Sequence, residues 1–219
     1  MLRGKNAIIT GARSGIGFAT LQLFAQKRVN CWAIVHRDDT EFEEQIQLLQ
    51  EQNNIWIKRV YIDLSESESI KTGIKEIIKE KRPIDILVNA AGIVSPDRLF
   101  SMTNMLDIRK VMDVNFFSIL VSRVMLRQRS GSIINVASVA ADCEDTSQLE
   151  YAASKAALVC ATKKLAREMG AVGIRVNAVS PGLTDTKMAQ EIEDKTMSKI
   201  NSGLTLRRLG RPEEIAKTI

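Results

Sequence analysis

The chain has 219 residues, of which 45% are hydrophobic and 26% charged, with a formal net charge of +5. This composition excludes a disordered chain, and the length suits one α/β domain with a sizeable core. No basic run exceeds a pair, and no apolar stretch approaches the ~18–20 residues that span a bilayer, so neither a nucleic-acid partner nor a membrane is expected.

The three cysteines, Cys31, Cys143 and Cys160, are far apart and form no C-x-x-C pair. Free thiols therefore fit better than a disulfide framework or a zinc site, and no metal site is expected. The N-terminus has only a short apolar run before a glycine-rich turn, which is unlike a signal peptide. We therefore expect a cytoplasmic protein.

Short apolar runs alternate with amphipathic stretches along the chain. Strands are predicted at residues 6–10, 31–35, 55–63, 84–90, 132–138 and 174–180. Helices are predicted at residues 16–26, 41–52, 65–81, 105–125 and 147–170, and again from 212. Capping boxes, Ser65 with Glu68 and Ser147 with Glu150, are expected to open the third and fifth of these helices. The alternation predicts a Rossmann-type, doubly wound parallel sheet in a three-layer α/β/α arrangement.

Residues 1–219 are predicted to form a single dinucleotide-binding and catalytic domain, because no linker or internal repeat interrupts them. Residues 184–211 have no clear strand and are polar, with several Met and Lys residues. A flap over a substrate site is one interpretation of this segment, and a plain surface excursion is the other.

Residues 10–17 join the first predicted strand to the first helix with the spacing G-x-x-x-G-x-G. Gly11 permits a tight turn, Gly15 lets the backbone approach a pyrophosphate, and Gly17 lets the helix pack closely on the strand. The N–H groups at the start of the helix would then face the phosphates. The turn predicts dinucleotide binding, although a purely structural strand-to-helix turn has the same pattern.

The second predicted strand ends in His36-Arg37. No acidic residue that would bind the ribose hydroxyls of NAD occurs there until Asp38, whereas Arg37 can hold a 2′-phosphate, with Arg13 assisting from the glycine turn. We therefore expect NADP (NADPH) rather than NAD. The alternative is that Arg37 is a solvated surface residue and Asp38 turns inward.

Tyr151 and Lys155 stand one turn apart on one face of a predicted helix. A nearby ammonium is expected to lower the phenol pKa from about 10, which makes the pair a general acid/base device. Ser138 ends a predicted strand, where ligands of α/β sheets bind, and its hydroxyl can donate to a substrate carbonyl. Each of these signals, taken singly, also fits an ordinary helix or strand end.

These motifs, in this order, resemble the short-chain dehydrogenase/reductase family over essentially the whole sequence. Further matching segments are Asp63-Leu64, Asn89-Ala90-Ala91-Gly92, Asn115, and Pro181-Gly182 with Thr184 and Thr186. The resemblance implies four catalytic residues: Ser138, Tyr151, Lys155 and Asn115. It implies that the cofactor is bound by Gly11, Arg13, Ser14, Gly15, Ile16, Gly17, Arg37, Asp63, Leu64, Asn89, Ala90, Gly92, Tyr151, Lys155, Pro181, Gly182, Thr184 and Thr186.

The implied reaction is hydride transfer between a nicotinamide dinucleotide and a carbonyl or alcohol carbon. By the resemblance, Tyr151 would protonate the oxygen that Ser138 orients. Lys155 would hold the nicotinamide ribose and depress the pKa of Tyr151. Asn115 would anchor a water that connects the site to solvent.

Within the family the resemblance is greatest to bacterial 3-oxoacyl-[acyl-carrier-protein] reductases. It implies fatty acid biosynthesis, an acyl-thioester or other small-molecule substrate, and an acidic acyl carrier protein as a partner. Arg127 and Arg129 are expected in the region of the site mouth, where basic residues would meet that carrier. Val172 stands where these reductases often carry a basic residue. The alternatives are a dehydrogenase of a sugar, polyol or other secondary alcohol, and a non-catalytic binding protein.

The sequence departs from the family pattern in two places. Family members continue well past the segment at 211–214 with a seventh strand and a dimer contact, whereas this chain stops at Ile219. Either the sequence is truncated or the sheet lacks its usual last strand. The stretch 125–131 is also more compact than usual. A homo-oligomer, either a dimer or a tetramer, is still expected.

Overall fold

The computed structural model describes residues 2–96, 99–143, 148–190, 206 and 208–219. Its strands are β1 (Asn6–Thr10), β2 (Asn30–Val35), β3 (Ile57–Tyr61), β4 (Ile86–Asn89), β5 (Gly131–Val136) and β6 (Ile174–Val179). Its helices are α1 (Gly15–Gln26), α2 (Thr40–Asn53), α3 (Ser67–Lys79), α4 (Met105–Asn115), α5 (Leu149–Gly170), α6 (Lys187–Gln190) and α8 (Pro212–Ala216). Three 3-10 segments are η1 (Phe100–Met102), η2 (Phe117–Met125) and η3 (Val139–Ala141).

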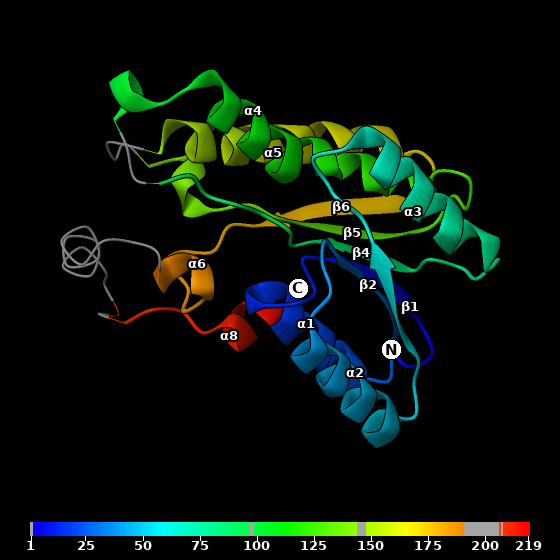
Figure 1. The fold of residues 1–219 in the computed structure, drawn as a ribbon. Coiled ribbons are helices and arrows are strands. Elements are labelled where there is room, and N and C mark those ends of the chain that lie inside the picture. The colour runs from blue at the N-terminus through cyan, green and yellow to red at the C-terminus, as the bar shows by residue number, and fades with distance from the viewer. Residues whose placement is uncertain (1, 97–98, 144–147, 191–205, 207) are drawn as a thin grey trace.

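The strands form a parallel sheet in the order β3-β2-β1-β4-β5-β6 (Figure 1). The chain runs outward from β1 to β3 and then returns to place β4 on the other side of β1. The strand order therefore reverses between β1 and β4, and ligands of such sheets bind beyond the carboxyl ends at this point. The doubly wound parallel sheet predicted from the sequence is confirmed. Among the described strands, β6 has β5 as its single neighbour.

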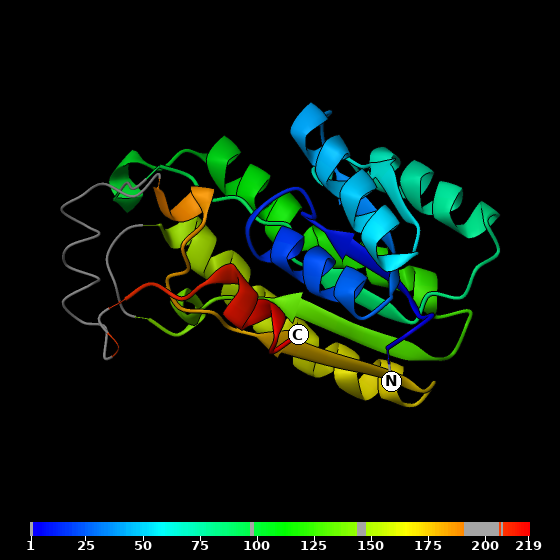
Figure 2. The ribbon, with the colours of Figure 1, turned by 90° about the horizontal axis from the view of Figure 1, so that it is seen from below.

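Helices cover both faces of the sheet. α1, α2 and α8 lie on one face, and α3, α4 and α5 lie on the other (Figures 1 and 2). Neighbouring strand residues point to opposite faces, so Ile9 packs into the core under α1 and α2 while Ile8 packs into the core under α3 and α5. Because both faces are covered, the inner strands β1, β2 and β4 are buried almost throughout and need nearly continuous apolar runs. The edge strands β3 and β6 instead alternate buried apolar residues with exposed polar or charged ones.

The predicted elements and the structure differ mainly at element ends. The predicted helix at 105–125 is interrupted, because α4 ends at Asn115 and η2 follows it. The predicted cap of α3 is wrong: the Ser65 hydroxyl donates to Asp63 at 2.6 Å, and Glu66 precedes the helix without a side-chain cap. α5 begins after Gln148, again without a side-chain cap, and Ser147 lies outside the described residues.

No helix in the described part of the chain is long and apolar enough to cross a membrane. The predicted flap at 184–211 is described only at 184–190, 206 and 208–211. Within these parts, Thr184 pairs with Gly210 in an isolated parallel bridge, and Gly210 N–H donates to the Leu183 carbonyl at 2.9 Å. The two ends of the segment therefore lie together, and residues 191–205 and 207 lie outside the described residues.

Candidate active site

The glycine turn between β1 and α1 is built around two close backbone contacts. Gly11 has φ +66°, and a Cβ there would lie 2.8 Å from Cα of Ala91. A Cβ on Gly17 would lie 2.2 Å from the Gly11 carbonyl oxygen, so the first turn of α1 packs directly on the end of β1. Both contacts exclude any side chain at these two positions. Ser14 and Gly15 at the start of α1 line a cavity, which is where a pyrophosphate would meet the helix N-terminus.

Ser14 and Gly15 lie where this turn enters α1. Ser14 precedes α1 in an extended conformation and makes no side-chain cap, so its hydroxyl does not occupy the helix N-terminus. Gly15 has φ +55°, and a Cβ there would lie 3.2 Å from Cγ2 of Thr186. The predicted pyrophosphate-binding turn and the predicted cofactor-binding residue Thr186 therefore lie against each other, and a larger residue at position 15 would press on Thr186.

Basic side chains gather beyond the ends of β1 and β2. The pKa of His36 is lowered, first by burial and then by the charges of Arg13 and Arg37, while Asp63 acts in the opposite direction. These four residues therefore lie within electrostatic reach of one another. Arg37 is exposed, whereas the Arg13 side chain is 16% exposed and its Nη1 donates to Asp39 at 2.7 Å.

The two carboxylates that follow β2 point to different partners. Asp38 accepts hydrogen bonds from the Tyr61 hydroxyl and from Arg59 on β3, and its side chain is 89% exposed. Asp39 accepts the Arg13 bond and caps α2 by accepting from Phe42 N–H at 3.2 Å. The alternative interpretation agrees with the structure in one part, because Arg37 is exposed. It disagrees in the other, because Asp38 does not turn inward toward a ribose.

Ser138, Tyr151 and Lys155 meet beyond the carboxyl end of β5. Ser138 follows the strand, and its Oγ accepts a hydrogen bond from Ala140 N–H at 3.2 Å. The same hydroxyl lies near enough to Tyr151 to act on the pKa of its phenol. Lys155 Nζ lies 5.7 Å from the centre of the Tyr151 ring and donates to the Val136 carbonyl at 2.9 Å. The sheet and the helix thus bring together three groups that the sequence separates by up to 17 positions.

The pKa values of Tyr151 and Lys155 differ in part from the expectation. Burial lowers the pKa of Lys155 from 10.5 to about 8. The pKa of Tyr151 is raised by burial, and the opposing influence is the hydrogen bond with Ser138. The expected lowering by Lys155 is not found, because the ammonium is turned to the Val136 carbonyl and desolvation of the phenol outweighs the favourable contacts.

Asn115 holds the loop after β4 against α5. Its amide donates to the Ile93 carbonyl at 2.9 Å and accepts from Ile93 N–H at 2.8 Å. The same amide nitrogen donates to Ser154 Oγ at 3.1 Å. A Cβ on Gly92 would lie 3.5 Å from the Asn115 Oδ1 and 3.4 Å from the Lys155 Nζ, so this segment closes the wall beside the lysine.

A second buried amide network lies below the site and was not predicted. Asn89 donates to Asn135 at 2.8 Å, and Asn135 donates to Thr162 on α5 at 2.8 Å. The sequence carried a signal for it, because Asn135 interrupts an apolar strand and a buried amide must find partners. Nearby, Thr10 Oγ1 accepts from Ala91 N–H at 3.0 Å, which ties β1 to the loop after β4.

The remaining predicted cofactor residues line the same edge of the sheet. Leu64 is buried, and the Asp63 carboxylate accepts from Ser65 N–H at 2.9 Å. The Pro181 carbonyl accepts from Val139 N–H at 3.0 Å, which joins the segment after β6 to the Ser138 turn. Thr184 is buried, and its hydroxyl donates to the Gly182 carbonyl at 3.0 Å.

Arg127 and Arg129 lie away from this site, and their expected position at its mouth is wrong. Both precede β5, and Ser138 follows it. The 6 residues of β5 span about 20 Å at ~3.3 Å per residue, so the two arginines lie at the opposite edge of the sheet from Ser138 of the same chain.

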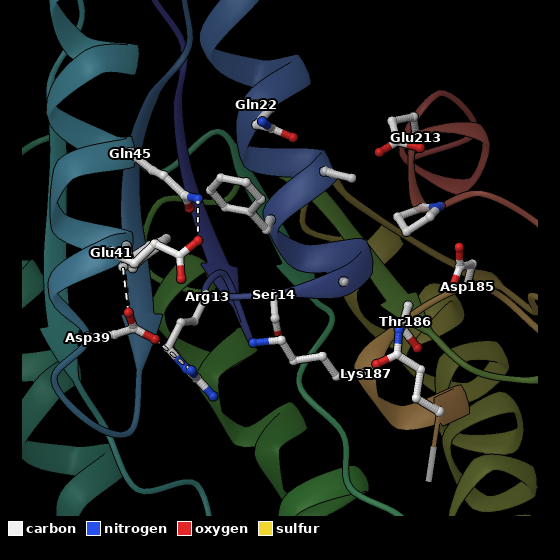
Figure 3. Close-up of a pocket in the computed structure, with 16 residues that line it drawn as sticks. Arg13, Ser14, Gln22, Asp39, Glu41, Gln45, Asp185, Thr186, Lys187 and Glu213 are labelled. Carbon is white, nitrogen blue, oxygen red and sulfur yellow. Dashed lines mark hydrogen bonds and ion pairs between the residues drawn. The ribbon is translucent and has the colours of Figure 1, made fainter. Parts of the chain in front are cut away.

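A cavity of about 380 Å³ lies beside the glycine turn, on its α2 and α8 side (Figure 3). Arg13 and Asp39 lie on one side of it, and Thr186 and Lys187 lie on the other. The cavity adjoins the predicted phosphate region rather than the Ser138 cluster. The turn, the open helix N-terminus and the neighbouring basic groups fit a phosphorylated dinucleotide.

Comparisons with known proteins agree with this geometry. The sequence profile of the short chain dehydrogenase family matches residues 5–197. A 3-oxoacyl-[acyl-carrier-protein] reductase FabG of Thermotoga maritima is 36% identical over 225 residues, covering 100% of this chain and 89% of the relative. Its counterpart in Chlamydia trachomatis is 34% identical, covering 99% and 89%. The crystal structure of an NADPH-dependent 3-quinuclidinone reductase from Rhodotorula rubra gives a TM-score of 0.91 at 27% identity, covering 99% of this chain and 83% of that one.

Proposed function

Because this chain belongs to the short-chain dehydrogenase family and is an NAD(P)-dependent oxidoreductase acting on CH–OH groups, we propose that it uses NADPH to reduce the ketone of a 3-oxoacyl thioester. The single observation that carries the proposed chemistry is the meeting of Ser138, Tyr151 and Lys155 beyond β5. The choice of substrate is supported by the 34% and 36% identity to two 3-oxoacyl-[acyl-carrier-protein] reductases over nearly the whole chain.

The cofactor, when bound, supplies the hydride for the carbonyl carbon. Its pyrophosphate would lie on the α1 N-terminus at Gly15 and Ile16, which the close packing of Gly17 on Gly11 holds against the end of β1. The adenine would lie near Asp63 and Leu64, and the carboxamide would lie near Thr186. The Lys155 ammonium has three N–H donors, so it would donate to the nicotinamide ribose beside its bond to the Val136 carbonyl.

Preference for NADPH rests on the charges at the end of β2. A 2′-phosphate carries more negative charge than the ribose hydroxyl that it replaces, and Arg13 and Arg37 provide guanidinium groups for it. Asp38 is engaged by Tyr61 and Arg59, so the carboxylate that would favour the hydroxyls of NAD is turned away.

Tyr151 is the proton donor in this proposal, and Ser138 orients the carbonyl oxygen. The raised pKa of Tyr151 keeps the phenol protonated at neutral pH, which suits the reduction direction. In the oxidation direction, the positive charge of the oxidised nicotinamide would favour the phenolate. The Asn115 side chain is fully engaged with Ile93 and Ser154, so its part would be to hold the loop, with a water bound nearby.

The test is a substrate panel with both cofactors. We expect an acetoacetyl thioester to be reduced with NADPH at a higher kcat/KM than sugars, polyols or simple ketones, and faster than with NADH. Tyr151→Phe should lose at least about 100-fold in kcat while the Kd for NADPH stays within about twofold. Turnover that survives Tyr151→Phe would remove Tyr151 from the mechanism. NADPH binding without turnover of any carbonyl would instead support the non-catalytic alternative.

We further propose that acyl carrier protein presents the acyl group, that the working form is a dimer or tetramer, and that the protein acts in the cytoplasm. Residues 1–219 would act as one domain, with 184–211 covering the substrate. Size measurement in solution and activity with a carrier-bound substrate address the oligomer and the carrier separately.

A further inference from the structure

Asp38 and Asp39 are adjacent in sequence, but their carboxylates bind different partners. Asp38 is bound from the β3 side by Tyr61 and Arg59. Asp39 faces the glycine turn, where its Oδ2 lies 2.7 Å from Nη1 of Arg13. The side chains of Arg13 and Asp39 are 16% and 26% exposed, so this ion pair is largely shielded from solvent. Its position is therefore fixed between α2 and the turn that would receive the cofactor.

Arg13 is only partly satisfied by this pair. Its Nε is buried and has no hydrogen-bond partner in the described residues. The cavity of about 380 Å³ opens beside the guanidinium, with Asp39 and Lys187 also in its wall (Figure 3). A guanidinium carries five N–H donors, so Arg13 has donors left for an oxyanion that arrives next to it.

We propose that Asp39 determines how strongly the enzyme prefers NADPH over NADH, because it competes with the 2′-phosphate of NADPH for Arg13. This inference rests on the proposed use of NADPH. Asp39 itself does not touch the reacting atoms and acts through Arg13.

The direction of the effect follows from charge. The carboxylate neutralises part of the Arg13 charge and repels an incoming phosphate, so NADPH binds against a standing ion pair. NADH brings no phosphate to this position and is not affected by the competition. Removing the negative charge at residue 39 should therefore strengthen NADPH binding and leave NADH binding nearly unchanged.

The chain provides a conservative variant and a matched control. Asp39→Asn removes the charge and keeps a side chain that caps helices as well as aspartate does, so α2 retains its Phe42 bond. Asp39→Ser is a second capping variant. Asp38→Asn removes the same charge one residue earlier, from a side chain that is 89% exposed and bonded to β3.

The measurement is the Kd of each reduced cofactor, followed by the fluorescence of the bound nicotinamide, together with steady-state kinetics. We expect Asp39→Asn and Asp39→Ser to lower the Kd and KM for NADPH by about fivefold. A change of this size corresponds to the loss of one partly exposed ion pair. The values for NADH should change less than twofold, and kcat should stay constant. The gain should shrink at high ionic strength. Asp38→Asn should change the NADPH Kd less than twofold.

A double-mutant cycle with Arg13→Gln separates competition from a general charge effect. In the Arg13→Gln background, Asp39→Asn should no longer improve NADPH binding. Weaker NADPH binding by Asp39→Asn, or an equal gain in Asp38→Asn, would overturn the inference. If the wild type itself binds NADH in preference to NADPH, the proposed cofactor fails, which the wild-type titration shows before any variant is made.

Discussion

Replacing Lys155 by methionine removes an ammonium from the interior and keeps an unbranched side chain of similar length. Lys155 is 4% exposed, and burial lowers its pKa from 10.5 to about 8. At ~1.4 kcal/mol per pH unit, burying the charged form costs about 3 kcal/mol at neutral pH. The Val136 carbonyl loses one donor in the variant, which offsets about 1 kcal/mol. We therefore expect Lys155→Met to be inactive and more stable than the wild type by about 2 kcal/mol at pH 7.

The pH dependence makes this expectation specific. The folded-state pKa lies below the unfolded-state value, so between pH 8 and 10.5 the unfolded chain binds more protons than the folded chain. The contribution of Lys155 to wild-type stability therefore rises with pH in this window, and the penalty is fully present below pH 8. The advantage of Lys155→Met should shrink to within about 0.5 kcal/mol at pH 9.5.

Urea unfolding at pH 7 and pH 9.5 measures both quantities, with the fluorescence of Trp32 and Trp56 as the signal. Protein concentration must be the same in all samples, because an oligomer would add a concentration term. Lys163→Met, at an exposed position of the same helix, should stay within about 0.5 kcal/mol of the wild type. A Lys155→Met protein that is less stable at pH 7, or an advantage independent of pH, would refute the reasoning.

The remaining predictions concern packing away from the reacting groups. Gly17→Ala should lower the free energy of unfolding by about 1–3 kcal/mol and weaken cofactor binding, because the new Cβ would lie 2.2 Å from the Gly11 carbonyl oxygen. The control is Gly170→Ala, whose new Cβ would have nothing within 4 Å. It should be neutral or stabilising in the same urea titration. Glu80→Leu should cost about 1–3 kcal/mol, because the fully buried Trp32 donates to Glu80 at 3.0 Å and would lose its acceptor. Glu80→Gln keeps an acceptor for Trp32 and should lower the free energy of unfolding by less than Glu80→Leu, as measured by circular dichroism. Equal losses in the two variants would contradict this account.

Much of the fold could be predicted because the inner strands β1, β2 and β4 are buried on both faces and therefore carry local signals. β1 agrees with the predicted residues 6–10, and β2 extends the predicted 31–35 by one residue. Errors occurred where a side chain had a competing partner. Ser65 was expected to cap α3, but the Asp63 carboxylate accepts its hydroxyl and its N–H. The backbone change after Asn115 carried no glycine or proline signal, so the helix was predicted to continue.

The candidate site could be predicted as a set of residues but not as a set of interactions. Tyr151 and Lys155 were expected to form a directly coupled pair from their spacing, whereas the ammonium bonds Val136 on the neighbouring strand. Arg13 and Asp39 are 26 positions apart, and nothing local indicates that they meet. Such contacts depend on how the ends of separate strands come together, which a periodic pattern does not contain.

Buried polar contacts, rather than the apolar core, therefore position the site. Asn89, Asn135 and Thr162 connect β4, β5 and α5, and Asn115 connects the loop after β4 to Ser154 on α5. Losing one of these hydrogen bonds would leave a buried amide group unsatisfied, which costs about 1–3 kcal/mol. This requirement fixes α5 relative to the two strands more sharply than interchangeable aliphatic contacts would. Since Tyr151 and Lys155 both lie on α5, the position of the phenol and the ammonium over the strand ends follows from where these amides find their hydrogen bonds.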